Sequence, residues 1–205
     1  MDHETLGYAC GVLCGSGFIK HGRNYCVGLQ TNNGILAEHF AESLRAIRGF
    51  ETLTRKKAID DKRYFIVNAY GKELVSIFDN IGFFPTRRSW LPPKISYDNP
   101  EFRSGLLAGF FDTASYVYFN REKFSISGSG YRYLRATSVN TAGLVEIKKL
   151  LLLEGIESNL RTTKGGLSYL TIRGDWRLKT FAERIKLRTS KKESIKIIMG
   201  VVSVN

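Results

Sequence analysis

Two short stretches of small and apolar residues are the first candidates for chemistry in this sequence. Residues 10–17 read CGVLCGSG and residues 107–115 read LAGFFDTAS, and both are typical of a helix. Each ends where a carboxylate that could hold a metal ion would be expected, but those positions carry Ser16 and Ala114. Asp112 is the only carboxylate within either stretch.

The cysteines and histidines offer no clear alternative site. Cys10, Cys14 and Cys26 are odd in number, so the sequence predicts no disulfide framework. Cys10 and Cys14 are spaced i,i+4 on the first helix, but the three histidines are scattered along the chain. We therefore expect these cysteines to be buried packing residues, and we expect no metal site.

The charge of the chain indicates a polyanionic partner. Its 205 residues include 31 Lys and Arg against 19 Asp and Glu, a net charge of +12 without a lysine-rich tail. A positive surface of this size favours nucleic acid over membrane, because no basic amphipathic helix stands out. The N-terminus is not typical of a secretory signal and no apolar run could span a bilayer. We expect a protein of the cytoplasm, or of an organellar matrix if the gene is organellar.

The two stretches open two similar halves. Gly11 and Gly109 mark equivalent points, 109 − 11 = 98 residues apart, and each half reads helix–strand–strand–helix–strand–strand–helix. The predicted fold class is α+β, with two pseudo-symmetric αββαββα repeats at 1–84 and 102–205. Residues 85–101 hold all four prolines and are predicted to form an extended linker. The tail from residue 191 is predicted to add one helix to the second repeat.

Glycines recur every four residues on both predicted motif helices. Gly costs helix stability, so several on one stripe need a packing reason. We expect the two helices to pack closely against each other between the halves, through Gly7, Gly11, Gly15, Gly105, Ala108 and Gly109.

The predicted strands alternate between an apolar and a polar face. Arg132, Leu134, Ala136 and Ser138 share one face of residues 131–138, and Tyr133 and Arg135 lie on the other. Helices that cover only one face would leave a basic, polar face that could lie in a nucleic-acid groove. The candidate DNA-binding residues are Lys20, Arg23, Gln30, Arg55, Lys57, Arg63, Asn68, Arg121, Arg132, Arg135, Arg161, Lys164 and Arg173.

LAGFFDTAS resembles the signature of the LAGLIDADG homing endonucleases, and ACGVLCGSG is a weaker second copy. The resemblance covers essentially the whole chain. It implies that the motif helices form the interface between the repeats and that two saddle-shaped antiparallel sheets grip a long, asymmetric DNA site. It also implies that the acidic residue ending each motif helix binds a divalent metal between the two scissile phosphates.

The chain departs from this family at the catalytic positions. The metal-binding Asp of the motif falls on Ser16 and on Ala114, and Ala cannot ligate a metal. Asp112 lies two residues earlier, about 200° around the helix, so we interpret it as a structural carboxylate, with a displaced metal ligand as the alternative. The basic residue that the family often carries near the end of the second strand falls near Thr31 and Val139, leaving Gln30 as a possible remnant.

Three functions remain open from the sequence. The first is a monomer that binds a long double-stranded DNA site specifically and has lost cleavage, with no cofactor expected. The second is an intron maturase that binds RNA, because loss of the metal carboxylates would not harm that work. The third is an active site-specific endonuclease, or a laboratory-inactivated variant of one, which would use Mg²⁺, held for instance by Asp112 and backbone carbonyls.

Overall fold

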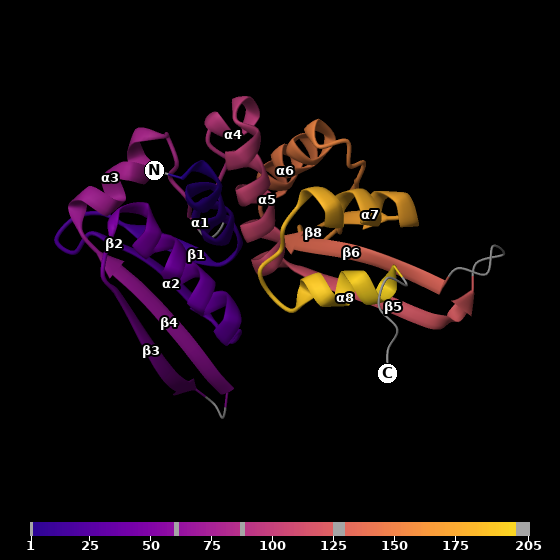
Figure 1. Ribbon diagram of the computed structural model, residues 1–205, viewed down its shortest axis with the longest axis horizontal. Helices are drawn as coiled ribbons and strands as arrows, with labels where there is room; N and C mark the ends of the chain where they lie inside the picture. The colour runs from indigo at the N-terminus through magenta and orange to yellow at the C-terminus, as the bar shows by residue number, and fades with distance from the viewer. Residues whose placement is uncertain (1, 60–61, 87–88, 125–129, 200–205) are drawn as a thin grey trace.

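The computed structural model describes residues 2–59, 62–86, 89–124 and 130–199 (Figure 1). Within these ranges it leaves undescribed the side chains of residues 59, 62, 121–124, 130, 131 and 198. The first repeat comprises α1 His3–Gly15, β1 Gly17–Lys20, β2 Cys26–Thr31, α2 Gly34–Arg48, β3 Thr52–Ile59, β4 Lys62–Tyr70 and α3 Lys72–Asn80. The second comprises α5 Pro100–Ala114, β5 Ser115–Phe124, β6 Gly130–Ser138, α6 Thr141–Leu153, β7 Asn159–Thr162, β8 Ser168–Arg173 and α7 Asp175–Arg184. Helix α4 (Ile95–Asp98) lies between the repeats and α8 (Lys191–Ile198) follows the second.

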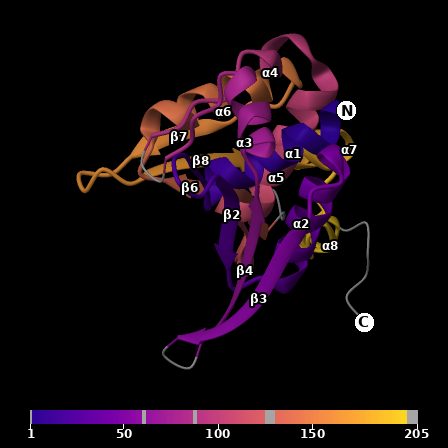
Figure 2. The same ribbon diagram turned by 90° about the vertical axis from the view of Figure 1, so that its left-hand side faces the viewer.

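Each repeat contains one four-stranded antiparallel sheet, and the two sheets have the same topology. Their strand orders are β1-β2-β4-β3 and β5-β6-β8-β7. Figure 2 shows the β3–β4 and β7–β8 hairpins extending in different directions away from the central helices α1 and α5. The α+β prediction with two equivalent αββαββα repeats is confirmed.

Helices cover one face of each sheet. In the first repeat, α2 buries Leu36, Phe40, Leu44 and Ile47, whose spacing places them on one side of a helix. They belong to the same core as the paired strand residues Leu29 and Val67. The second repeat repeats this arrangement, with α6 packed on β8 over Leu134, Leu170 and Ile172. The opposite face of each sheet carries mostly polar and aromatic side chains, with Leu53 and Ile66 among them in the first sheet.

The motif helices α1 and α5 pack backbone against backbone. A Cβ added at Gly7 would lie 2.1 Å from the carbonyl oxygen of Phe102, and one at Gly105 would lie 2.0 Å from that of Glu4. The second pair of glycines repeats this contact, with Gly11 facing Leu106 at 2.1 Å and Gly109 facing Tyr8 at 2.2 Å. The contacts are exchanged under the 98-residue offset, so a pseudo-twofold axis passes between the helices.

The remaining two predicted interface residues also lie on these helices. A Cβ at Gly15 would lie 2.5 Å from Cβ of Thr113, which occupies the equivalent place on α5. Ala108 is buried, with 2% of its surface exposed. The predicted contact between the two motif helices is therefore confirmed at the five glycines.

The segment between the repeats is folded, which corrects the prediction of an extended linker over 85–101. Helix α4 lies within it, and α5 begins at Pro100, because Pro is tolerated in the first helical turn and Asn99 caps the helix through a 2.9 Å bond from the Phe102 amide. Trp90 is buried, with its carbonyl 2.6 Å from Nδ2 of Asn140. The predicted C-terminal helix is confirmed as α8, which packs on β5 and α7.

Two further observations concern the described residues only. The three cysteines are buried and free, as expected of packing residues. None of the described helices combines the length and apolar character needed to cross a membrane.

Candidate nucleic-acid interface

The open face of the first sheet carries most of the basic and amide residues predicted for that repeat. Val27, Leu29 and Val67 point toward the helices, so their alternating neighbours point away from them. Five predicted DNA-binding residues lie on this open face, namely Lys20, Gln30, Arg55, Lys57 and Asn68. Asn68 is half-buried and the other four are exposed. Arg23 is exposed in the turn between β1 and β2.

Arg63 and Arg132 do not lie on the open faces, and their prediction as groove-facing residues is wrong. Arg63 alternates with Phe65 and Val67 along β4 and therefore points to the side that α2 covers. Arg132 shares its face with Leu134 and forms an ion pair with Asp175 in the first turn of α7, with Nε 2.7 Å from Oδ1. That pair uses the Arg132 charge within the protein.

The open face of the second sheet carries Arg135, Arg161 and Arg173, and Lys164 is exposed in the β7–β8 turn. Arg135 is held by its neighbours, since its guanidinium carbon lies 4.4 Å from the Tyr133 ring centroid and 5.4 Å from that of Tyr169. Its Nε donates to Oγ1 of Thr171 at 3.1 Å. The side chain of Arg121 on β5 falls outside the described residues.

Tyrosines form a ridge beside Arg135 to which the sequence reasoning gave no role. Tyr118 stacks on Tyr133 with ring centroids 4.9 Å apart, and Tyr116 meets Tyr133 edge to face at 6.2 Å. Burial is the largest cause that raises the pKa of Tyr133, so this phenol is neutral at ordinary pH. Tyr116 keeps 40% of its surface exposed. The signal in the sequence is that these tyrosines alternate with buried residues along the same strands.

A central hollow of about 830 Å³ lies between the sheets at the end of α1. Its lining residues are Leu13, Cys14, Gly15, Ser16, Gly17, Phe18, Gln30, Tyr64, Thr137, Ser138, Val139 and Leu167. Ser16 is exposed there, whereas Ala114 at the end of α5 is half-buried against the core. None of the lining residues carries a carboxylate or an imidazole.

This donor set does not fit the divalent metal that the resemblance implies. Such ions take hard oxygen ligands, ordinarily carboxylates, and the hollow offers neutral hydroxyl and amide groups. Burial raises the pKa of the Cys14 thiol, which therefore stays protonated and is a poor ligand. Within the part of the chain that the structure describes, no cluster of three or more His, Cys, Asp or Glu residues could hold a metal ion.

Asp112 points away from this hollow and is a structural carboxylate. It is 1% exposed and accepts a hydrogen bond from Tyr8 Oη at 3.1 Å. It also accepts from the backbone amides of Arg188 at 2.8 Å and Thr189 at 3.2 Å, and from Thr189 Oγ1 at 2.5 Å. The three bonds from Arg188 and Thr189 fasten the segment that precedes α8 to the motif helix α5, and the bond from Tyr8 joins α5 to α1.

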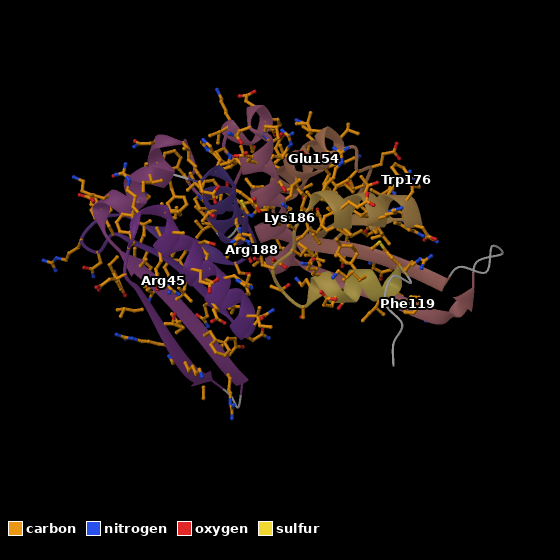
Figure 3. The ribbon with its side chains drawn as sticks, viewed as in Figure 1. Arg45, Phe119, Glu154, Trp176, Lys186 and Arg188 are labelled. Atoms are coloured by element: carbon orange, nitrogen blue, oxygen red, sulfur yellow. The ribbon has the colours of Figure 1, made fainter. Side chains whose placement is uncertain are left out.

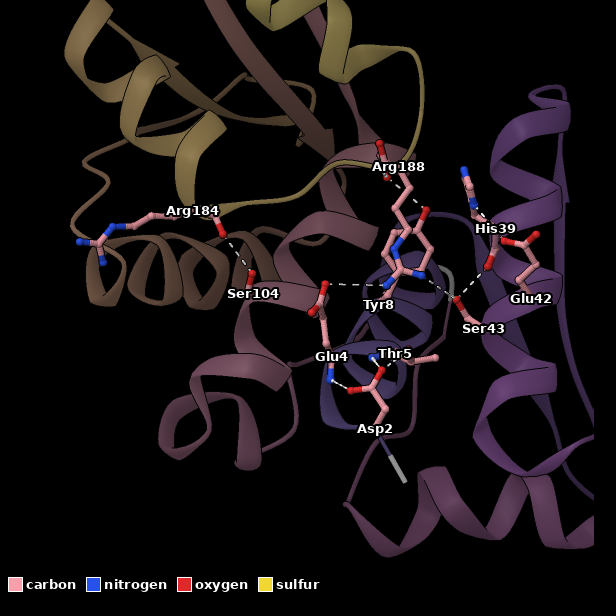
Figure 4. Close-up of polar contacts among 11 residues, drawn as sticks. Asp2, Glu4, Thr5, Tyr8, His39, Glu42, Ser43, Ser104, Arg184 and Arg188 are labelled. Atoms are coloured by element: carbon pink, nitrogen blue, oxygen red, sulfur yellow. Dashed lines mark hydrogen bonds and ion pairs between the residues drawn. The ribbon is translucent and has the colours of Figure 1, made fainter.

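The same segment connects the two repeats. The guanidinium carbon of Arg188 lies 4.1 Å from the Tyr8 ring centroid. Nη2 of Arg188 lies 3.9 Å from the Glu4 carboxylate. Its Nη1 donates to Oγ of Ser43 on α2 at 3.4 Å, so one side chain from the second repeat reaches two helices of the first (Figure 4). Figure 3 shows Arg188 at this seam, on the side of the molecule that carries the helices.

Comparisons with known proteins agree with this architecture. Residues 101–186 match a family model described as a LAGLIDADG-like domain. The crystal structure of I-DmoI in complex with DNA and Mn superposes with a TM-score of 0.63 at 17% identity, over 90% of this chain and 97% of that one. The complex of I-DmoI with DNA and Ca gives a TM-score of 0.66 at 15% identity, over 96% of this chain and 100% of that one.

A second kind of structure is equally similar. Full-length DUF199/WhiA from Thermatoga maritima gives a TM-score of 0.66 at 13% identity, over 100% of this chain and 62% of that one. At these identities the matches establish the fold. A search of curated protein sequences gave no significant match.

Proposed function

We propose that this chain is a LAGLIDADG protein that binds a long double-stranded DNA site as a monomer without cleaving it. The family match of its second repeat and the fold of both repeats support this proposal. One observation carries the proposal: both sheets leave one face uncovered by helices, and exposed cations lie on those faces. Arg55 and Lys57 form no ion pair with any residue that the structure describes, so their charges are available to phosphates.

The charge and the relatives support the same partner. The net charge of +12 provides the sequence-independent attraction that brings a protein to DNA. The I-DmoI structures were determined in complex with DNA, and they share the two-repeat fold. Because this chain holds both repeats itself, a single copy provides both sheets.

The proposed lack of cleavage rests on the central hollow. Hydrolysis of a phosphodiester in this family requires acidic residues at the ends of the motif helices, and this chain carries Ser16 and Ala114 there. Asp112 cannot replace them from where it lies, because its carboxylate is buried and already accepts four hydrogen bonds.

Binding can be tested with a duplex selected from a random pool, measured by fluorescence anisotropy at several salt concentrations. We expect affinity to fall steeply with salt, and we expect Lys57→Gln to reduce the slope of log affinity against log salt by about 1. Lys148→Gln is the matched control, because Lys148 is exposed on α6, on the helical side. Affinity that does not depend on salt, or an equal effect of both variants, would contradict the proposed interface.

Cleavage is tested separately with the selected duplex and Mg²⁺ or Mn²⁺. We expect no discrete product, and any site-specific cut by the unmodified chain would show that it is an endonuclease. Adding structured intron RNA as a competitor tests the maturase alternative. If such RNA displaces the duplex more effectively than unrelated duplex does, the partner is RNA.

A further inference from the structure

The open faces of the two sheets can be compared residue by residue through their hydrogen-bonded ladders. On each open face, directly paired residues of neighbouring strands form a row across the sheet. The row starts at the second residue of the first strand after the motif helix. This row runs Phe18, Gly28, Asn68 in the first sheet and Tyr116, Arg135, Thr171 in the second. The flanking positions Gln30 and Thr137 are equivalent by the same register, as are Cys26 and Tyr133.

This comparison reveals a marked asymmetry. Cys26 and Gly28 are small, whereas their equivalents Tyr133 and Arg135 form part of the ridge on the second sheet. The first sheet accordingly has a hollow of about 390 Å³, which we call the sheet-1 hollow. It is lined by Phe18, Lys20, Asn24, Cys26, Gln30, Ile66, Asn68 and Tyr70.

The sheet-1 hollow combines two amides with an apolar wall. Gln30 is exposed, and its side chain makes no hydrogen bond to any of the described residues. Oδ1 of Asn68 lies 3.8 Å from Sγ of Cys26, which directs the carbonyl end of this amide toward the sheet. Phe18 and Ile66 are half-buried and supply apolar surface beside the amides. Both amide positions are threonines in the second sheet.

We propose that the sheet-1 hollow reads an adenine–thymine base pair in the half of the DNA site that the first repeat contacts. The inference rests on the proposed function, since it requires a duplex on this face. A side-chain amide offers one donor and one acceptor, which match N7 and the N6 amino group of adenine. Gln30, with Asn68 beside it, provides these groups, and the thymine 5-methyl contacts Phe18 and Ile66.

The other base pairs fit this hollow less well. Guanine presents two acceptors in the major groove, so the amide carbonyl of Gln30 would face an acceptor. Cytosine lacks the methyl group that the apolar wall would contact. The ridge on the second sheet offers no amide at the equivalent positions, so we expect no adenine–thymine requirement there from Thr137 and Thr171.

The experiment replaces single atoms of the DNA. In a duplex selected by the protein, each thymine is exchanged in turn for uracil, and each adenine for 7-deazaadenine. We expect one base pair at which loss of the methyl weakens binding about fourfold and loss of N7 weakens it roughly fivefold. Gln30→Thr and Asn68→Thr, which place the second sheet's residues in the first, should abolish the effect of 7-deazaadenine at that base pair.

Thr137→Val is the matched control, because it alters the equivalent point on the second sheet and should leave both effects in place. The thermal unfolding and the salt dependence of each variant show that it is folded and still binds DNA. If the selected duplex binds with the expected salt dependence but no pair responds to both exchanges, or the response to 7-deazaadenine survives in Gln30→Thr and Asn68→Thr, the assignment is wrong. If no duplex is selected at all, the proposed function fails instead.

Discussion

The contact between α1 and α5 can be tested by adding one methyl group at Gly109. An ideal Cβ at this position lies 2.2 Å from the carbonyl oxygen of Tyr8 and 2.9 Å from the amide nitrogen of Val12. Both are backbone atoms of a helix, so neither can rotate out of the way. Since non-bonded carbon contacts are comfortable at about 3.5 Å or more, the helices must separate by roughly 1 Å.

Two contributions to the free energy of unfolding oppose each other in Gly109→Ala. Alanine is favoured over glycine within a helix by about 1 kcal/mol, which would stabilise the protein if the position were open. Overfilling a packed contact costs about 1–3 kcal/mol and occasionally more. Because one displacement loosens the contacts of Gly7, Gly11 and Gly105 as well, we expect a cost at the upper end of that range, about 3 kcal/mol, and a net loss of about 2 kcal/mol.

Urea unfolding followed by circular dichroism measures this loss. Gly165→Ala is the control, because the nearest atom to its added Cβ is Oγ1 of Thr163 at 3.9 Å and Gly165 is not among the glycines with positive φ. It should change stability by less than about 0.5 kcal/mol. Gly11→Ala should match Gly109→Ala, and the double variant should lose less than the sum, since helices already apart accommodate the second methyl.

A gain of about 1 kcal/mol in Gly109→Ala would mean that helix propensity alone decides the outcome at this position. In that case the repeats would not meet through their backbones, and the pseudo-twofold seam described above would be wrong.

Three further predictions address the polar contacts. Asp112→Asn should lower the free energy of unfolding by about 2 kcal/mol in urea titrations, because an amide cannot accept from all four donors. The affinity of this variant for the duplex, measured well below its melting temperature, should stay unchanged. Burial lowers the pKa of Lys191 from 10.5 to about 8, so the unfolded state binds more protons between these pH values and the stability due to this residue rises with pH. The free energy of unfolding of the wild type minus that of Lys191→Met should therefore increase by about 2 kcal/mol from about pH 7.5 to about pH 9.5. A difference that does not change with pH would contradict the lowered pKa. Arg132→Gln should leave duplex affinity unchanged in anisotropy titrations, whereas Arg161→Gln should weaken it about threefold; equal losses would show that Arg132 reaches the DNA after all.

The repeat structure and the helix seam could be predicted because both depend on local periodicity. Glycines four residues apart form one stripe of a helix, and the 98-residue offset identifies which stripe meets which. The alternation along residues 131–138 likewise assigned Leu134 and Ala136 to the buried face and Arg135 to the open face. Period alone is sufficient for these assignments, since a strand has only two faces.

The predictions for Arg132 and Arg63 are wrong because they rest on the positive charge of the side chain and not on its position along the strand. Arg132 shares a face with Leu134, so the alternation already argued against a groove-facing role, and its ion pair comes from Asp175, 43 residues further on. Arg63 depends on the register of β4, which the sequence leaves undetermined by one residue. The partners of Asp112 lie 76, 77 and 104 residues away, beyond the reach of any local pattern.

The seam explains how this fold can be kept without acidic residues at the helix ends. The backbone-to-backbone contacts between α1 and α5 lie at Gly7, Gly11, Gly105 and Gly109, one or more turns before Ser16 and Ala114. A carboxylate at either end would lie at the negative end of a helix dipole and near its counterpart across the pseudo-twofold axis, which costs about 0.3–1 kcal/mol per charge unless a cation offsets it. A serine and an alanine remove that cost and leave the close backbone contact intact, so the geometry that sets the two sheets relative to each other depends on the glycines rather than on Ser16 and Ala114.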